Sequence, residues 1–426
     1  MRVVRNPEME IIKVLLKRSE VNLIELEGVV KEIFDDVSKC GDEALRKYTS
    51  KFDRVALVDF LVTKNEFEEA EKKVGSELKK AIQLAAENIK KFHTSQKESV
   101  VEVETMKGVT CWRKSIGIEK VGLYIPGGTA PLFSTVLMLG VPANIAGCEE
   151  VVLCTPCGLD GKVNPVVLYA AQLVGIEKVY KVGGIQAIAA MTFGTESIPN
   201  VYKIFGPGNQ YVTAAKQYAQ RFKVAIDMPA GPSEVMVVCD VDSNEKFVAA
   251  DLLSQAEHGV DSQVVLICND ALKVELIQQE LEAQLKELRR NEIAVKALDN
   301  SVAMIVDKSD FSKIINEYAP EHLILNTNFN EELIPLIKNA GSVFIGQYTP
   351  ESAGDYASGT NHTLPTNGYA RQYSGVSLDS FVKKITFQKI TEEGLLNIGR
   401  TVELMAEAEG LDAHKNAITV RLNTLK

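Results

Sequence analysis

The sequence contains little histidine and has no long apolar run, signal-peptide pattern or excess of positive charge. Only five of its 426 residues are histidine, and the formal net charge is −10. A negative chain is not expected to bind nucleic acid, because phosphate binding requires basic surfaces. The N-terminus lacks the apolar stretch of a signal peptide, and Pro142 and Asn144 interrupt the most apolar segment, 130–147. We therefore expect a cytoplasmic globular protein that has no membrane partner.

Cysteine is also scarce, and its spacing argues against a disulfide framework. The seven cysteines are an odd number at irregular intervals. Cys154-Thr155-Pro156-Cys157 forms a C-x-x-C motif, but the chain has no second such pair for a structural zinc site. The motif follows the apolar run 150–153 and so stands at the end of a predicted strand. Reduced, buried or half-buried thiols are favoured over a redox or metal role.

The chain is long enough for two or three domains, and its predicted secondary structure changes along its length. Helical periodicity dominates the first 115 residues, mainly 22–48 and 65–93, and His93 is read as a structural residue near a helix end. From residue 120, short β-rich runs alternate with helical patterns in two successive modules, which predicts mostly parallel sheets. A helix-rich tail begins near residue 379. It is too small for a core of its own and should pack on another domain or subunit.

Three glycine-rich turns lie in the first of these modules, at 124–128, 183–186 and 206–209. Glycine allows backbone N–H groups to approach a ligand, and a following helix N-terminus favours an anion such as a pyrophosphate. None of the turns completes G-x-G-x-x-G, because Tyr211 stands at the third glycine position. No acidic residue stands at the usual place for a ribose contact. The three turns are therefore compatible with a dinucleotide-binding site and equally with the ordinary tight turns of an α/β fold.

Four of the five histidines lie near carboxylates or a carboxamide, a setting that suits metal binding or proton transfer near neutral pH. These settings are Gln255 with Glu257 and His258, Glu321 with His322, Asp355 with His362, and Glu409 with His414. Scattered surface histidines with common neighbours are the alternative. Taken as a set, the four pairs indicate one polar catalytic site.

Two of these pairs suggest a local geometry. Gln255 and His258 are three residues apart at the end of the predicted helix 244–257, which Gly259 would close, so both side chains would share one face. With Asp355 from a polar loop and His414 from the tail they form an N/O set that suits zinc and also tolerates manganese or cobalt.

Glu321 and His322 begin a predicted strand, where both side chains can enter one cavity and supply a base. An exposed dipeptide is the alternative reading of this pair.

Together these segments resemble the histidinol dehydrogenase family. The matching stretches follow the family order at 121–128, 206–209, 227–234, 254–259, 319–323 and 409–414. The resemblance implies an enzyme that uses one zinc per subunit and NAD to oxidise L-histidinol through L-histidinal to L-histidine. Zinc would position the substrate against the nicotinamide. Cys157 departs from the family pattern, but it puts no catalytic position in doubt.

The resemblance also implies roles for individual residues. The implied zinc ligands are Gln255, His258, Asp355 and His414. These four would also contact the substrate, together with Ser233, Glu321, His322 and Glu409. The implied NAD contacts are Tyr124, Gln186 and Asn209. His322 would be the general base, Glu321 would activate water for the aldehyde step, and His362 matches a histidine close to the substrate.

The expected fold class is α/β, with two incomplete Rossmann-like modules, a helical N-terminal region and a small helical C-terminal tail. The expected parts are an N-terminal arm (1–25), a first α/β domain (26–119 and 234–378), an NAD-binding domain (120–233) and a dimerisation tail (379–426). The resemblance implies a homodimer in which each tail completes the partner's site. From the residues alone, a zinc-dependent hydrolase that uses Glu321 as base, or a non-catalytic metabolite-binding protein, stays open.

Overall fold

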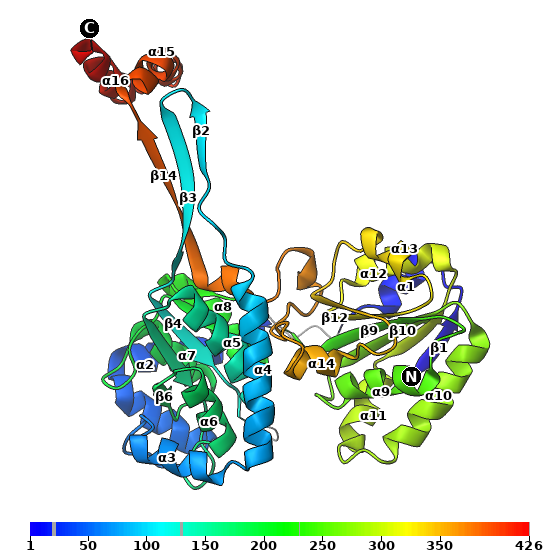
Figure 1. The fold of residues 1–426 in the computed structure, drawn as a ribbon. Coiled ribbons are helices and arrows are strands. Elements are labelled where there is room, and N and C mark those ends of the chain that lie inside the picture. Colours follow the sequence, from blue (N-terminus) through cyan, green and yellow to red (C-terminus); the bar gives the residue numbers. More distant parts are fainter. Residues whose placement is uncertain (19–22, 128–130, 230, 426) are drawn as a thin grey trace. The chain divides into compact units, whose positions relative to one another are not determined.

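The computed structural model describes residues 1–18, 23–127, 131–229 and 231–425, which divide into two units by their contacts (Figure 1). The first unit comprises Met1–Ser95 and Ile118–Phe381, and the second comprises Gln96–Gly117 and Val382–Lys426. Gly128 and Ala230, which belong to motifs quoted above, lie outside the described residues, as do residues 19–22 of the predicted N-terminal arm. The α/β class with mostly parallel sheets is confirmed.

The first unit contains a five-stranded parallel sheet in the order β6-β5-β4-β7-β8. Its strands are β4 (Lys120–Tyr124), β5 (Glu150–Cys154), β6 (Lys178–Tyr180), β7 (Lys203–Phe205) and β8 (Ala225–Ile226). The helices between them are α5 (Phe133–Ala146), α6 (Pro165–Leu173), α7 (Gly184–Phe193), α8 (Gln210–Ala219) and the short η1 (Gln220–Phe222). Side chains of β5 alternate between two cores: Leu153 packs in one, while Val152 and Cys154 pack in the other.

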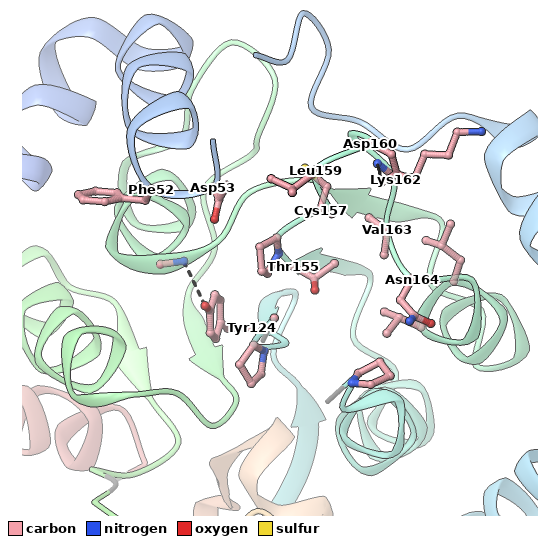
Figure 2. Close-up of a pocket in the computed structure, with 18 of the residues that line it drawn as sticks. Phe52, Asp53, Tyr124, Thr155, Cys157, Leu159, Asp160, Lys162, Val163 and Asn164 are labelled. Carbon is pink, nitrogen blue, oxygen red and sulfur yellow. Dashed lines mark hydrogen bonds between the residues drawn. The ribbon is translucent and has the colours of Figure 1, made fainter. Parts of the chain in front are cut away.

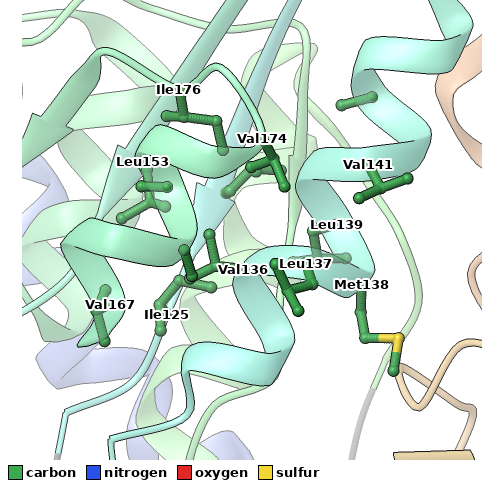
Figure 3. Close-up of a cluster of buried hydrophobic side chains, with 14 of the residues drawn as sticks. Ile125, Val136, Leu137, Met138, Leu139, Val141, Leu153, Val167, Val174 and Ile176 are labelled. Carbon is green, nitrogen blue, oxygen red and sulfur yellow. The ribbon is translucent and has the colours of Figure 1, made fainter. Parts of the chain in front are cut away.

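Three N-terminal helices complete these two cores. They are α2 (Leu23–Phe52), α3 (Lys64–Lys73) and α4 (Ser76–Thr94). One core joins Ile82 and Ile89 to the cluster around Leu139 and Leu153, part of which is shown in Figure 3. The expected first α/β domain joined residues 26–119 to 234–378. Side-chain packing instead places α2 to α4 on the five-stranded sheet, because the apolar stripes of these helices cover its two faces.

A six-stranded parallel sheet lies in the same unit, in the order β1-β11-β10-β9-β12-β13. Its strands are β1 (Arg2–Arg5), β9 (Glu234–Cys239), β10 (Gln263–Cys268), β11 (Val302–Ile305), β12 (His322–Asn326) and β13 (Ser342–Ile345). The main helices are α1 (Met9–Leu15), α9 (Glu245–Ala256), α10 (Ala271–Leu285), α11 (Asn291–Asp299), α12 (Phe311–Tyr318), α13 (Asn330–Leu333) and α14 (Glu351–Tyr356). Every residue of β9, β10 and β12 is buried, as expected for a parallel sheet covered on both faces.

Short 3₁₀ segments complete this unit, at η2 (Lys308–Asp310), η3 (Ile334–Leu336), η4 (Tyr369–Arg371) and η5 (Leu378–Phe381).

The second unit is an antiparallel sheet followed by two helices. It consists of β2 (Glu102–Met106), β3 (Val109–Gly117), β14 (Val382–Ile390), α15 (Glu392–Ala408) and α16 (Asp412–Thr424). The expected helical N-terminal region and helix-rich tail are confirmed, but the strands β1, β2, β3 and β14 within them were not predicted. Strand β14 pairs with β3 across more than 260 residues, whereas β2 and β3 pair locally. Contacts between distant segments, such as the stacked rings of Trp112 and Phe387, leave no local signal in the sequence.

Candidate active site

A large cavity opens at the carboxyl ends of the five-stranded sheet (Figure 2). The strand order reverses between β4 and β7, and ligands of open α/β sheets bind outside the carboxyl ends of the strands at such a point. The cavity has a volume of about 1090 Å³. Its walls come from the ends of these strands, from the first turns of α7 and α8, and from the N-terminal helices. This size and position suit a dinucleotide.

The three expected cofactor residues line this cavity together. The Tyr124 hydroxyl accepts a hydrogen bond from the Gly184 N–H at 3.1 Å, and burial raises the pKa of Tyr124 to about 12. Gln186 lies in the first turn of α7, where its buried Oε1 has no hydrogen-bond partner among the described residues. Asn209 caps the N-terminus of α8. These three residues were expected from the family resemblance, and each ends or follows a strand that leads into one of the glycine-rich turns.

Two residues that were not expected at the cofactor site, Phe52 and Asp53, reach the same cavity from the end of α2. Both are drawn in Figure 2, with Asp53 beside the cavity. No local motif could have identified them, because their proximity to Tyr124 arises only when α2 packs on the sheet.

A second, smaller cavity of about 290 Å³ contains the expected substrate residue Ser233 and the expected ligand His258. Asn209 also lines this cavity, so the two cavities share one side chain. The other described lining residues are mostly small or polar, among them Gln210, Thr213, Asp261 and Asn367. A polar pocket of this size suits a small hydrophilic substrate.

Glu321 and His322 stand at the amino end of β12, as the sequence predicted. The Nε2 atom of His322 lies 3.4 Å from Oδ1 of Asp355, and its Nδ1 atom lies 3.7 Å from Oε2 of Glu321. The main-chain carbonyl of Asp355 lies 2.8 Å from Nδ1 of His362. Glu321 and His322 are buried, and Asp355 is largely so. Three histidine–carboxylate settings of the sequence therefore come together here, with His258 close enough to interact electrostatically with Asp355.

Backbone geometry explains how Glu321 and His322 enter one site. Helix α12 ends at Ala319 in the left-handed conformation (φ 52°), which turns the chain toward β12. The Glu321 carboxylate then accepts the N–H of Glu234 at 2.8 Å, while His322 Nδ1 lies 3.1 Å from the Glu234 carbonyl. A Cβ on Gly341 would lie 2.5 Å from the Glu321 carbonyl oxygen. Glycine at that position allows the close approach of the chain that follows.

The electrostatics of the cluster arise from opposite charges in a buried setting. Burial lowers the pKa of His322, but the charges of Glu321, Asp355 and Glu351 outweigh it and raise the pKa to about 10. Burial raises the pKa of Glu321 to about 8, against the opposing effect of His322. Burial also acts to raise the pKa of Asp355, but contact with His322 holds it below its ordinary value. Coupled titratable groups in a buried site are typical of proton-transfer chemistry.

Comparison with known proteins identifies the family. Residues 16–422 match a family model described as histidinol dehydrogenase. The chain is 58% identical over 427 residues to histidinol dehydrogenase from Bacteroides thetaiotaomicron, with 100% of both chains covered. A chloroplastic histidinol dehydrogenase from Arabidopsis thaliana is 52% identical over 97% of this chain and 89% of its own. A crystal structure of histidinol dehydrogenase from Elizabethkingia anophelis matches with a TM-score of 0.98 and 56% identity, covering 100% of this chain and 98% of that one.

The chain belongs to the histidinol dehydrogenase family. The resemblance inferred from the sequence motifs is thereby confirmed, and the chain is an oxidoreductase of histidine biosynthesis. Within the described residues no helix has both the length and the apolar character needed to cross a bilayer.

Several residues of this histidinol dehydrogenase family member fit a zinc ion. Gln255 is 1% exposed, and neither its Oε1 nor its Nε2 has a hydrogen-bond partner in the described part of the chain. Burial lowers the pKa of His258, against the opposing charge of Asp355, which favours the neutral imidazole that metals bind. The amide oxygen of Gln255, the neutral imidazole of His258 and the carboxylate of Asp355 form a donor set that suits zinc.

The fourth expected ligand lies in the other unit. His414 is an exposed residue of α16, and Glu409 is the exposed C-cap of α15. Among residues that the structure describes, no group of three or more His, Cys, Asp or Glu side chains is close enough to hold a metal. Only two ligands of the first unit, His258 and Asp355, are of these types. The complete ligand set therefore stays a prediction.

Two local expectations about the ligands were wrong. Helix α9 ends at Ala256 with Glu257 as its C-cap, and Gly259 does not adopt the left-handed conformation of a glycine cap. His258 therefore lies beyond the helix, so it does not share a helix face with Gln255. Asp355 lies in the short helix α14 rather than in a loop, because Gly354 packs closely against Phe344 and permits a helical turn there.

The remaining histidine and the cysteines have structural settings. His93 is buried, with Nδ1 2.9 Å from the carbonyl oxygen of Ile89, as expected for a structural residue near a helix end. All seven cysteines are free. Burial raises the pKa of the thiols of Cys154 and Cys157, which keeps both protonated and disfavours a redox role.

Proposed function

We propose that this enzyme oxidises L-histidinol through L-histidinal to L-histidine, with one hydride passed to NAD in each of the two steps. The observation that carries the proposal is that Asn209 lines both cavities. A dinucleotide in the large cavity would meet a small polar alcohol in the cavity that contains Ser233 and His258. Family membership supports the same substrate.

His322 is proposed as the general base of both oxidations. Removal of hydride from an alcohol requires loss of the hydroxyl proton, which His322 can accept only in its neutral form. The neighbouring carboxylates raise the pKa of His322 to about 10, so the imidazole must first lose a proton before it acts as the base. The Glu234 carbonyl can accept only from a protonated Nδ1, so Nε2 is the atom that takes the proton. Nε2 makes no hydrogen bond of good geometry with other described residues, although Asp355 lies 3.4 Å away. The neighbouring carboxylates stabilise the imidazolium that forms.

Glu321 is proposed to activate water in the second oxidation. The aldehyde must first add water, and this step requires a base near the carbonyl carbon. Glu321 is buried beside His322, and burial raises the pKa of its carboxyl group to about 8, so it binds a proton more readily than an exposed carboxylate. The Glu234 N–H fixes one carboxylate oxygen and leaves the other for water.

Gln255, His258, Asp355 and His414 are proposed to hold one zinc ion per subunit. When bound, zinc supplies a Lewis-acidic clamp for the imidazole and amine of the substrate. The unpartnered buried amide of Gln255 supports this assignment. Ser233 and Glu409 are proposed as additional substrate contacts.

His362 is proposed as a support for the Asp355 segment. Its Nδ1 lies 2.8 Å from the Asp355 carbonyl oxygen, and its Nε2 lies 2.9 Å from the Thr135 hydroxyl. With both ring nitrogens engaged by protein atoms, the imidazole can fix the main chain of a metal ligand.

Tyr124, Gln186 and Asn209 are proposed to bind NAD, which accepts the hydride when bound. The size of the cavity, its place at the reversal of strand order and the unpartnered Gln186 oxygen fit this cofactor.

We further propose a cytoplasmic homodimer in which each tail completes the partner's site. Glu409 and His414 are exposed, as are the apolar side chains of Leu404, Met405 and Val420 on the same two helices. Exposed apolar surface beside polar site residues favours contact with another subunit. The seven free cysteines suit a reducing compartment.

A single assay tests the proposed reaction. NADH absorbance should rise when histidinol and NAD are mixed with the enzyme, with two NADH formed for each histidine released. A strong chelator should abolish the increase, and added zinc should restore it. Absence of NADH formation by folded, zinc-loaded protein would contradict the proposed reaction.

A further inference from the structure

Asp53 differs from the other carboxylates that line the large cavity, which are Glu66, Glu69 and Asp160. Glu66 accepts a hydrogen bond from Lys181 Nζ at 3.0 Å, and Glu69 accepts one from Lys162 Nζ at 3.0 Å. Asp160 accepts the Lys162 N–H at 3.1 Å. The buried Oδ2 atom of Asp53 has no hydrogen-bond partner within the described ranges. A buried carboxylate oxygen is costly unless a donor reaches it, so this atom points to a ligand.

The surroundings of Asp53 place its side chain at the cavity. Burial raises the pKa of Asp53 to about 6. The Asp53 charge also acts to raise the pKa of Tyr124 and Cys157, two other lining residues, which shows that the three groups are close. Figure 2 draws these side chains around the same space.

The position of Asp53 relative to Asn209 indicates which part of a dinucleotide it would meet. Asn209 lines both cavities, whereas Asp53 lines only the large one. A dinucleotide whose nicotinamide is directed toward the small cavity therefore extends its adenosine half into the part of the large cavity away from it. At the end of β5, where a dinucleotide fold commonly places a ribose-binding carboxylate, this chain has Thr155 and Cys157.

We propose that Asp53 binds the hydroxyl groups of the adenosine ribose and thereby selects NAD over NADP. The inference rests on the proposed function for its cofactor. The two ribose hydroxyls would supply donors to a carboxylate whose Oδ2 lacks one. A 2′-phosphate would replace one donor with negative charge beside the carboxylate, which opposes binding. In this proposal Asp53, at the end of α2, replaces the ribose-binding carboxylate that a dinucleotide fold commonly has at the end of the strand corresponding to β5.

The test compares Asp53→Asn with Asp160→Asn, which removes a carboxylate from the same cavity. NADH and NADPH are titrated by fluorescence without histidinol, and kcat/KM is then measured for NAD and NADP. Asp53→Asn should weaken NADH binding by about tenfold, the effect of losing one charge-assisted hydrogen bond, while NADPH binding is unchanged or tightens. The preference for NAD should fall by about the same factor. Asp160→Asn should change neither affinity.

Thermal unfolding separates this role from a structural one. Asp53→Asn removes an unsatisfied charge, so its Tm should equal or exceed that of the wild type. Unchanged NADH and NADPH affinities in Asp53→Asn would overturn the proposal. Equal loss of both affinities with a lower Tm would also overturn it, as would a wild type that binds neither nucleotide. If the wild type binds NADH but does not oxidise histidinol, the proposed reaction fails and the binding comparison still decides the role of Asp53.

Discussion

At the residue scale, Glu234 connects the groups proposed to move protons. Its N–H donates to Glu321 and its carbonyl faces His322, while its own carboxylate is bound by Arg18 at 2.5 and 2.8 Å. It also accepts the N–H of Asn367 at 2.7 Å. The main chain of one buried residue therefore sets the positions of two reactive side chains. Such support holds reacting groups in a fixed geometry before the substrate arrives.

The two residues held by Glu234 should affect the two oxidations differently. His322→Asn should slow oxidation of both histidinol and histidinal, because each loses a proton to this base. Glu321→Gln should slow the histidinal step more, because only that step must activate water. Loss of one general base costs roughly 10²- to 10⁴-fold in rate. Separate measurement of the two half-reactions provides the check, and equal losses in both for Glu321→Gln would contradict this division.

Metal binding is tested at His258. His258→Asn should sharply reduce bound zinc and turnover while leaving the thermal unfolding transition intact, because the side chain lies beyond the end of α9. Zinc is measured by atomic absorption, and Glu257→Gln, in the same segment, is the matched control. A His258→Asn enzyme with full zinc and full activity would show that the ligand assignment is wrong.

The sequence predicted residues that follow strands but missed those brought by packing. The glycine-rich turns that carry Tyr124, Gln186 and Asn209 could be found because strand ends and such turns mark one edge of a parallel sheet, and the family resemblance then indicated these three residues. Asp53 and Arg18 could not, because α2 and the N-terminal segment reach their sites only through tertiary contacts. The helix around Asp355 was not predicted either, because it also depends on a tertiary contact, that of Gly354 with Phe344.

At the scale of elements, the two parallel sheets use opposite edges. The large cavity lies at the carboxyl ends of the five-stranded sheet, whereas Glu234 and His322 begin β9 and β12 of the six-stranded sheet. At the carboxyl ends of β9 and β12, Asp240 accepts the Asn328 N–H at 2.7 Å. The fold class therefore predicted the cavity at the carboxyl ends of the five-stranded sheet. It did not predict that the proposed proton-transfer residues lie at the amino ends of strands in the six-stranded sheet.

The N-terminal segment is joined to the six-stranded sheet by the ion pair of Arg18 and Glu234. Arg18 also donates to the Tyr318 carbonyl at 2.7 Å, and its guanidinium lies 4.0 Å from the centre of the Tyr318 ring. Arg18→Met should destabilise the protein by about 3–5 kcal/mol, because it leaves the Glu234 carboxylate buried without its cation.

Urea unfolding measures this effect. The double variant Arg18→Met/Glu234→Gln should recover much of the lost stability, since it removes the unpaired charge as well. A double variant no more stable than Arg18→Met would show that the ion pair is not the source of the loss.

At the scale of the whole molecule, the residues assigned to one reaction are divided between two structural units. Gln255, His258 and Asp355 belong to the first unit, and Glu409 and His414 belong to the second. The second unit has a small sheet and two helices on which apolar side chains are exposed. The proposed dimer would cover this exposed apolar surface.

Subunit mixing tests whether the tail serves the partner chain. His258→Asn and His414→Asn proteins, each inactive alone, are combined under conditions that allow exchange. If the site is shared, each heterodimer contains one site with both lesions and one site with neither. Random exchange makes about half of the molecules heterodimers, so activity should recover to roughly a quarter of that of the wild type.

The opposite arrangement gives a different result from the same mixture. If each tail completed the site of its own chain, every site would carry one lesion and exchange would restore no activity. Differently tagged subunits that are captured together establish that exchange has occurred. Proven exchange without recovered NADH formation would refute the shared site, while the zinc content of His258→Asn would still decide whether His258 is a ligand.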